Sequence, residues 1–276
     1  MKNILIADSG STKTDWQIML PLNVSIKHQT QGINPFHMSE ETIKGIISSE
    51  LLPAIGECMD KDEIGEIHFY GAGCTPAKIP VLEGILKELF PAAEVVEVAS
   101  DLLGAAKALC GNREGIACIL GTGANSCLYD GEKIVENVSP MGFILGDEGS
   151  GAVIGRTFIN ELYKGKHRDF IGVFEAETGL SQADLIQKVY REPMPNRFLA
   201  SLSVFINQHL EEQSWMKDMI TECFRNFFRK NISHYNRPDL EVNFVGSIAF
   251  YYQDMLKKAA NLEGFKIGRI IKNPLG

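Results

Sequence analysis

The sequence lacks the features that mark several classes of protein. No segment offers 18 uncharged apolar residues in a row, and the first apolar run stops at Asp8, so we expect neither a membrane span nor a signal peptide. None of the six cysteines forms a C-x-x-C pair, which predicts buried free thiols in a reducing, cytoplasmic setting. The net charge is -8, whereas a nucleic-acid binder needs a basic face. We therefore expect no nucleic-acid partner and no membrane partner.

Two common nucleotide motifs are also missing. The sequence contains neither G-x-x-x-x-G-K-[ST] nor G-x-G-x-x-G, which argues against a P-loop and against a Rossmann dinucleotide site. No low-complexity linker interrupts the chain. Its 276 residues, 45% of them hydrophobic and 22% charged, suffice for two medium-sized domains with their own cores.

What is present is an alternation of short apolar runs and amphipathic segments. Apolar runs of strand length indicate strands, and apolar residues at helical spacing, once with Ser39 as an N-cap, indicate helices. For the first part of the chain this predicts strands at 3–7, 15–20, 23–30, 66–73 and 94–100, and helices at 38–55, 76–90 and 101–111.

A similar order begins again in the middle of the chain. Segment 115–138 reads as a buried strand, a glycine–hydroxyl turn, a second strand, a tight Asp130-Gly131 turn and a third strand. When segment 6–10 is placed on segment 119–123, Gly10 falls on Gly123, which favours an internal duplication. The remainder predicts helices at 151–165, 174–191 and 196–236, a strand, glycine turn and helix over 241–264, and a last strand from 265.

Each half contains a turn of small residues directly after its first strand. "DSGSTKT" (8–14) and "GTGANS" (121–126) both offer backbone N–H groups and hydroxyls that an anion can accept. Asp8 would repel a phosphate unless it held Mg²⁺, directly or through water. The alternative is a plain hairpin turn in which Asp8 caps local amides. The second turn in the repeat favours the phosphate interpretation.

Five motifs, in this order, carry a resemblance to a known family: "ADSGSTKTDW", "VASDLLGAAKAL", "ILGTGANSCLYDG", "MGFILGDEGSGAVIGR" and "VGSIA". Over nearly its whole length the chain resembles the N-acetylglucosamine kinase and BadF/BadG/BcrA/BcrD ATPase family of the actin, Hsp70 and sugar-kinase superfamily. The resemblance implies an α/β fold of two ribonuclease-H-like domains, 1–104 and 105–276, with an interdomain cleft that closes on ATP and Mg²⁺.

The resemblance also implies which residues bind the nucleotide. It makes 8–14 the first phosphate loop and 121–126 the second, and it places 246–249 near the adenosine. Asp8 is then the metal residue, and the nucleotide-binding residues are Ser9, Gly10, Ser11, Thr12, Lys13, Thr14, Gly121, Thr122, Gly123, Gly246 and Ser247.

Phosphoryl transfer to an alcohol needs a carboxylate that orients the hydroxyl and accepts its proton. From the residues alone, Asp101 is equally an ordinary acid at a helix N-terminus, and the acid pair at 147–148 is equally a turn among glycines. The resemblance implies that Asp101, in Ser100-Asp101, is the catalytic base. It also implies that the sugar is bound by Asn34, Asn125, Phe143, Asp147 and Glu148, with phenylalanine where the family often has tryptophan.

The resemblance thus implies an ATP-dependent kinase whose small-molecule substrate is an amino sugar, N-acetylglucosamine or a close relative. Two alternatives stay open: a BadF-type ATPase activator of a dehydratase, which needs cysteines placed to ligate an iron–sulfur cluster, and a non-catalytic sugar-sensing protein on the same fold. A homodimer through the helical second half is compatible with the pattern. The family continues past a P-x-x-G turn into a last helix on the first domain, and this sequence ends at Gly276, where that turn begins.

Overall fold

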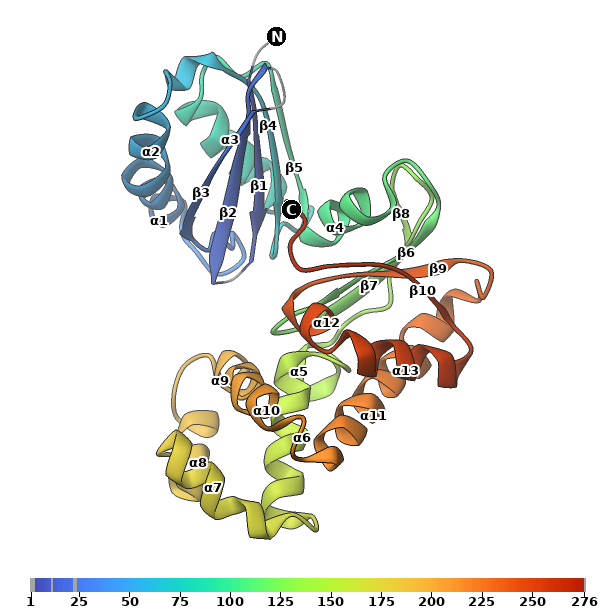
Figure 1. Ribbon diagram of the computed structural model, residues 1–276. Helices are drawn as coiled ribbons and strands as arrows, with labels where there is room; N and C mark the ends of the chain where they lie inside the picture. Colours follow the sequence, from blue (N-terminus) through green and yellow to red (C-terminus); the bar gives the residue numbers. More distant parts are fainter. Residues whose placement is uncertain (1–2, 11, 22–23, 276) are drawn as a thin grey trace. The chain divides into compact units, whose positions relative to one another are not determined.

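The computed structural model describes residues 3–10, 12–21 and 24–275 (Figure 1). Within them, the chain divides into two compact units, one up to Ala108 and one from Leu109 to Pro274. The change from one unit to the other falls inside helix α4 (Asp101–Cys110). The domain boundary predicted after residue 104 lies in this same helix.

The first unit is built on a five-stranded mixed sheet with the order β3-β2-β1-β4-β5 (Figure 1). The first three strands pair antiparallel, and the last two join β1 in parallel. Alternate residues of β1, among them Leu5 and Ala7, are buried in the core of the unit. The strands are β1 (Asn3–Ser9), β2 (Lys13–Met19), β3 (Ser25–Gln31), β4 (Ile64–Gly71) and β5 (Val95–Ser100).

Helices between the strands contribute to that core. The predicted cap at Ser39 is confirmed, because its side chain accepts the N–H of Thr42 at the start of α1. The helix predicted over 38–55 is not regular throughout, since a π-helical turn separates its two α-helical parts. The elements are α1 (Glu40–Ile46), the π turn (Ile47–Leu51), α2 (Leu52–Gly56), a 3₁₀ turn (Lys61–Glu63) and α3 (Ile79–Leu89).

The second unit repeats the strand order of the first. Its sheet runs β10-β9-β6-β7-β8, so each strand occupies the place of the strand five earlier, and the predicted repeat in the order of strands is confirmed. The hairpin turns differ in length: Ser9 pairs with Thr14 in the first, whereas Leu120 pairs with Ala124 in the second, which is one residue shorter. The strands are β6 (Gly115–Leu120), β7 (Ala124–Tyr129), β8 (Ile134–Glu136), β9 (Glu241–Val245) and β10 (Lys266–Ile271).

Helices make up most of the rest of the second unit, and two of the predicted ones were wrong in length. The helix predicted over 174–191 ends at Gly179, whose φ of 68° is left-handed. The helix predicted over 196–236 is three helices and a 3₁₀ turn (Ile232–Tyr235), separated at Leu202 and around Gln213. The helices are α5 (Gly142–Leu145), α6 (Gly151–Lys164), α7 (Ile171–Thr178), α8 (Gln182–Tyr190), α9 (Pro195–Ser201), α10 (Ser203–His209), α11 (Ser214–Lys230), α12 (Ser247–Tyr251) and α13 (Gln253–Glu263), with a 3₁₀ turn at Arg168–Phe170.

The cysteines agree with the sequence prediction in all but one position. All six are free, and five are buried. Cys58 is exposed, contrary to expectation, because it lies in the turn that follows α2. In the described part of the chain, no helix is both long enough and apolar enough to cross a bilayer.

Candidate active site

The first phosphate turn begins with a carboxylate on the far side of β1 from the core. The alternation that buries Leu5 and Ala7 turns Asp8 to the opposite face, where it lies across from Asp15 in the β1–β2 register. Burial raises the pKa of Asp8 to about 7, and the negative charges of Asp101 and Asp15 add to the effect. Lys13 opposes this rise, although its ammonium is paired with Asp15 at 2.7 Å.

Asp101 stands where β5 ends and α4 begins. Its Oδ1 accepts the N–H of Leu102 at 2.9 Å, and the hydroxyl of Ser100 accepts the N–H of Leu103 at 3.3 Å. Burial raises the pKa of Asp101, while the backbone N–H donors at the helix start hold it down. The charge of Asp101 also contributes to the raised pKa of Asp8 and to that of the buried Cys74 thiol, which is about 12. The structure therefore brings the predicted base and the predicted metal residue together in one unit.

The carboxylates around Asp8 fit a magnesium ion whose remaining ligands would be waters and substrate phosphates. Burial and the negative charges of Asp101 and Asp15 raise the pKa of Asp8, so a divalent cation would stabilise its charged form, and oxygen is the donor that Mg²⁺ takes. Among the residues described, no group of three or more His, Cys, Asp or Glu side chains is arranged to hold a metal. Because Mg²⁺ usually takes one or two carboxylates together with waters and substrate phosphates, such a group is not required.

The hydroxyls predicted to face the nucleotide in this turn are largely engaged elsewhere. Ser9 and Thr14 are fully buried, with 2.6 Å between their hydroxyl oxygens. Both contact the chain at and just after the end of β3: Thr14 Oγ1 donates to the carbonyl of Gln31 at 3.1 Å, and the hydroxyl proton of Ser9 is shared between Thr14 Oγ1 and the carbonyl of Ile33 at 2.9 Å.

The rest of the first turn lies at the surface. Gly10 and Thr12 are exposed, and the N–H of Gly10 donates to the carbonyl of Lys13 at 3.0 Å. The carbonyl of Thr12 accepts the N–H of Gly32 at 3.1 Å. Ser11, also predicted to bind nucleotide, lies outside the described residues.

Asn34 is held in the loop after β3. It is only 7% exposed, and its Oδ1 accepts the N–H of Phe36 at 3.0 Å. Gly73 packs directly against it: a Cβ on Gly73 would lie 2.0 Å from Asn34 Oδ1, and its φ of +77° also favours glycine. Sequence reasoning gave Gly73 no role, although it is the second glycine of the "GAG" that ends the β4 region.

The first part of the second predicted phosphate loop (121–126), Gly121–Gly123, is bonded on one side to helix α6. The N–H of Gly151 donates to the carbonyl of Gly121 at 2.8 Å, and that of Ala152 to the carbonyl of Thr122 at 3.1 Å. In a trans peptide the carbonyl oxygen and the next N–H point in opposite directions. The N–H groups of Thr122 and Gly123 are therefore directed away from α6, as an anion-binding turn requires.

Gly246 brings the predicted adenosine segment onto this turn. Its φ is +122°, and a Cβ there would lie 2.3 Å from the carbonyl oxygen of Leu120 and 3.3 Å from the nitrogen of Gly121. Only glycine permits this close crossing of two backbones. Ser247, the first residue of α12, is exposed beside it.

Asp147 lies against the same turn from another side. Its φ of 52° is left-handed, and this conformation is fixed by the bond of its N–H to the carbonyl of Pro140 at 2.8 Å. The carboxylate accepts the N–H of Ala124, and its Oδ2 would be 3.2 Å from a Cβ on Gly123. Burial raises the pKa of Asp147 to about 6, and Glu148 adds to this. A predicted sugar carboxylate thus contacts a predicted phosphate turn.

Two other predicted sugar residues are tied to neighbours in the second unit. Asn125 Oδ1 accepts an N–H of the Asn137 side chain at 2.9 Å. Phe143 is partly buried on α5, and its carbonyl accepts from Arg156 at 2.8 Å.

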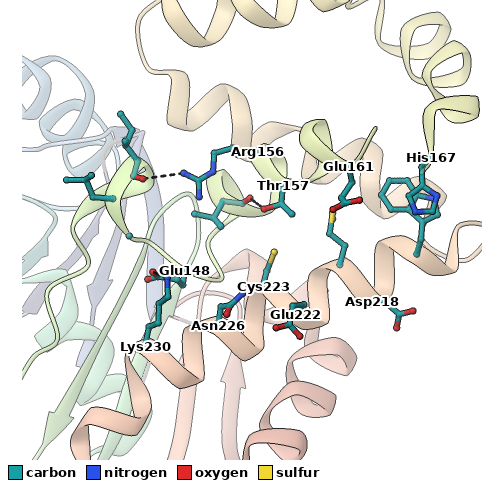
Figure 2. A pocket seen from close by; sticks show the side chains of 16 residues that line it. Glu148, Arg156, Thr157, Glu161, His167, Asp218, Glu222, Cys223, Asn226 and Lys230 are labelled. Carbon is teal, nitrogen blue, oxygen red and sulfur yellow. Dashed lines mark hydrogen bonds and ion pairs between the residues drawn. The ribbon is translucent and has the colours of Figure 1, made fainter. Parts of the chain in front are cut away.

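Glu148 lines a groove of about 620 Å³ formed by residues of α5, α6 and α11 (Figure 2). Figure 2 shows its carboxylate facing Lys230, at 3.1 Å. Among the residues that line this groove, Glu148 is the member of the predicted site set, and Asp147 is not among them. The two neighbouring acids therefore face different parts of the unit: Glu148 faces the groove, and Asp147 faces the turn at Gly123.

Comparison with known proteins decides the family. No family model matches the chain. A solved structure from Porphyromonas gingivalis, described as a candidate N-acetylglucosamine kinase, is 48% identical, with a TM-score of 0.91 over 99% of this chain and 95% of that one. The chain belongs to the N-acetylglucosamine kinase family.

Two more distant proteins are also similar to this chain, one in sequence and one in fold. The N-acetylmuramic acid/N-acetylglucosamine kinase of Clostridium acetobutylicum is 25% identical over 242 residues, which are 83% of this chain and 78% of that protein. A candidate N-acetylglucosamine kinase from Chromobacterium violaceum shares the fold, with a TM-score of 0.73 at 16% identity over 98% of this chain and 94% of that one. The predicted α/β fold of the actin-like ATPases is confirmed.

Proposed function

We propose that the protein is an ATP-dependent kinase that transfers the γ-phosphoryl group of ATP to a hydroxyl of an amino sugar. The relatives named above support this substrate class, N-acetylglucosamine and N-acetylmuramic acid being the two sugars in their names. The observation that carries the proposal is the position of Asp8 and Asp101 at the same edge of one sheet: the parallel strands pair Ser9 with Gly71 and Gly71 with Ser100, and Asp101 adds to the burial that raises the pKa of Asp8. Such a site suits a metal-bound phosphate and an acceptor hydroxyl.

Nucleotide-binding roles are assigned separately to one turn in each unit. The N–H groups of Thr122 and Gly123, directed away from α6, are suited to phosphate oxygens, and Gly246 with Ser247 lies beside them for the adenosine. Asp8 would hold Mg²⁺, which when bound neutralises charge on the phosphates. Lys13 is turned toward Asp15, so its contribution to the phosphates depends on breaking that ion pair.

Asp101 is assigned as the base. The N–H of Leu102 binds one carboxylate oxygen of Asp101, and the second oxygen can then accept the proton of the sugar hydroxyl that receives the phosphoryl group. Its raised pKa makes the carboxylate a better proton acceptor than an exposed aspartate. Asp147 and Asn34 are assigned to other polar groups of the sugar, since a carboxylate accepts from hydroxyls and a carboxamide can donate. The cytoplasmic location and the homodimer stay predictions.

The proposal is tested with an ATP-coupled assay over a panel of sugars: N-acetylglucosamine, N-acetylmuramic acid, N-acetylmannosamine and glucose. We expect turnover with at least one N-acetylated amino sugar. Asp101→Asn should lower kcat by about 10²- to 10⁴-fold while retaining sugar binding, because general-base catalysis is lost and the shape is kept. Asp62→Asn, at an exposed acid of the same unit, is the matched control and should be fully active. A fully active Asp101→Asn enzyme would move the role of base to another carboxylate.

A further inference from the structure

The buried hydroxyls of Ser9 and Thr14 form a connected pair at the base of the first phosphate turn. Ser9 Oγ accepts the N–H of Ile33 at 3.0 Å, and its one proton is shared between the carbonyl of Ile33 at 2.9 Å and Thr14 Oγ1 at 2.6 Å. Thr14 Oγ1 lies 3.2 Å from the same N–H and donates to the carbonyl of Gln31 at 3.1 Å. Both backbone polar groups of Ile33, the residue before Asn34, are therefore bound by hydroxyls of the hairpin β1–β2.

Asn34 follows directly and presents one kind of hydrogen-bonding group. Its Oδ1 is taken by the N–H of Phe36, and its carbonyl accepts the N–H groups of His37 and Met38, both at 3.1 Å. In the described part of the chain, Nδ2 of Asn34 has no hydrogen-bond partner. No fully buried side-chain nitrogen or oxygen there lacks a partner, so Nδ2 reaches the surface of the unit as a donor.

The opposite side of Asn34 is closed by the turn after β4. The carbonyl of Ser9 accepts the N–H of Ala72 at 2.8 Å, which ties this turn to the same residue that binds Ile33. Gly73, the next residue, contacts Asn34 so closely that no side chain fits between them. Ser9 thus bonds to both segments that flank the carboxamide of Asn34: the loop after β3, through Ile33, and the turn after β4, through Ala72.

We propose that Ser9 and Thr14 are positioning residues for the sugar, and that their hydroxyls are not ligands of the phosphates. This inference rests on the proposed kinase function. The pair fixes the loop 32–38 so that Asn34 directs its Nδ2 donor toward an acceptor oxygen of the sugar. The sequence motif predicted to form a phosphate loop therefore also contains residues that position a sugar-binding side chain.

The test is a matched pair of substitutions at Thr14. Thr14→Val keeps the shape of the side chain and removes the hydroxyl, whereas Thr14→Ser keeps the hydroxyl. In Thr14→Val we expect KM for the sugar to rise about 2- to 12-fold, the equivalent of one lost hydrogen bond, with KM for ATP within a factor of two of wild type. Thr14→Ser should restore sugar KM to within a factor of two. Calorimetric titration with the sugar alone should show the same ratio in Kd.

Gly73→Ala is the second variant, because it displaces Asn34 without touching the hydroxyl pair. It should also raise KM for the sugar and leave KM for ATP unchanged. If Thr14→Val instead raises KM for ATP, the hydroxyls serve the phosphates and the inference is overturned. If Thr14→Val leaves the sugar KM unchanged while Gly73→Ala raises it, Asn34 is placed by Gly73 alone and the inference again fails. A wild-type enzyme with no turnover on any sugar would refute the proposed function itself.

Discussion

Gly246 offers the sharpest test of how the second unit builds its nucleotide turn. In Gly246→Ala, the new Cβ would lie 2.3 Å from the carbonyl oxygen of Leu120, where Cβ atoms essentially never come closer than 3.0 Å. The two backbones would have to separate by about 0.7 Å. Since Leu120 precedes the turn, the displacement reaches the amides of Thr122 and Gly123.

The energetic cost has two parts. Alanine at a φ of +122° costs about 1–3 kcal/mol of backbone strain, and the forced separation costs about 1–3 kcal/mol more. We therefore expect Gly246→Ala to destabilise the protein by about 2–6 kcal/mol. For a unit of this size, the midpoint of thermal unfolding should fall by roughly 5–20 °C.

The assay combines thermal unfolding with KM for ATP. Gly172→Ala is the matched control, because Gly172 is exposed in α7 with open space around its Cβ position, and alanine there should stabilise by about 0.4–1 kcal/mol. Folded Gly246→Ala enzyme should show a raised KM for ATP with an unchanged KM for sugar. An alanine variant with wild-type stability and wild-type KM for ATP would show that the close crossing of Gly246 and Leu120 has no functional weight.

Three further predictions concern single side chains. The pKa of Asp8 is about 7 in the folded protein against its ordinary value of 3.8. Without divalent cations, its contribution to the free energy of unfolding is therefore greatest below pH 4 and falls as the pH rises from 4 to 7. In urea unfolding at several pH values, Asp8→Asn should remove this decrease, and an increase of stability with pH in the wild type would contradict the assignment. Asp147→Asn should raise KM for the sugar about 10-fold or more without lowering stability, since asparagine tolerates the left-handed backbone; an unchanged KM would exclude a sugar contact. Tyr235→Phe should cost about 1–3 kcal/mol in unfolding free energy, because the buried hydroxyl of Ser126 and the N–H of Val138 lose a partner, and a neutral result would mean that water replaces it.

The strands and turns were predictable because their signals are local. The apolar runs, the Asp130-Gly131 turn and the Ser39 cap each depend on a few neighbouring residues, and each is where the sequence places it. The broken helix over 196–236 was not predictable from its period, since apolar residues keep helical spacing on both sides of Leu202. There, tertiary packing decides where one helix stops.

The burial of Ser9 and Thr14 could have been predicted from the sequence but was not. The alternation that buries Leu5 and Ala7 also buries Ser9, just as the alternation in β2 that buries Trp16 buries Thr14. The motif directed attention to the phosphates, although strand periodicity already placed these hydroxyls inside. The contact of Gly73 with Asn34 joins two loops that follow different strands, and no local pattern in the sequence reports it.

The repeated strand order gives the molecule two copies of one turn, and the copies have diverged in kind. The first kept an acid and several hydroxyls, while the second is reduced to glycines and a threonine held by a helix. A protein with a single such turn would have to reconcile metal affinity and bare amide donors in the same few residues. With two, each turn can differ in its residues while the strand order around it stays the same.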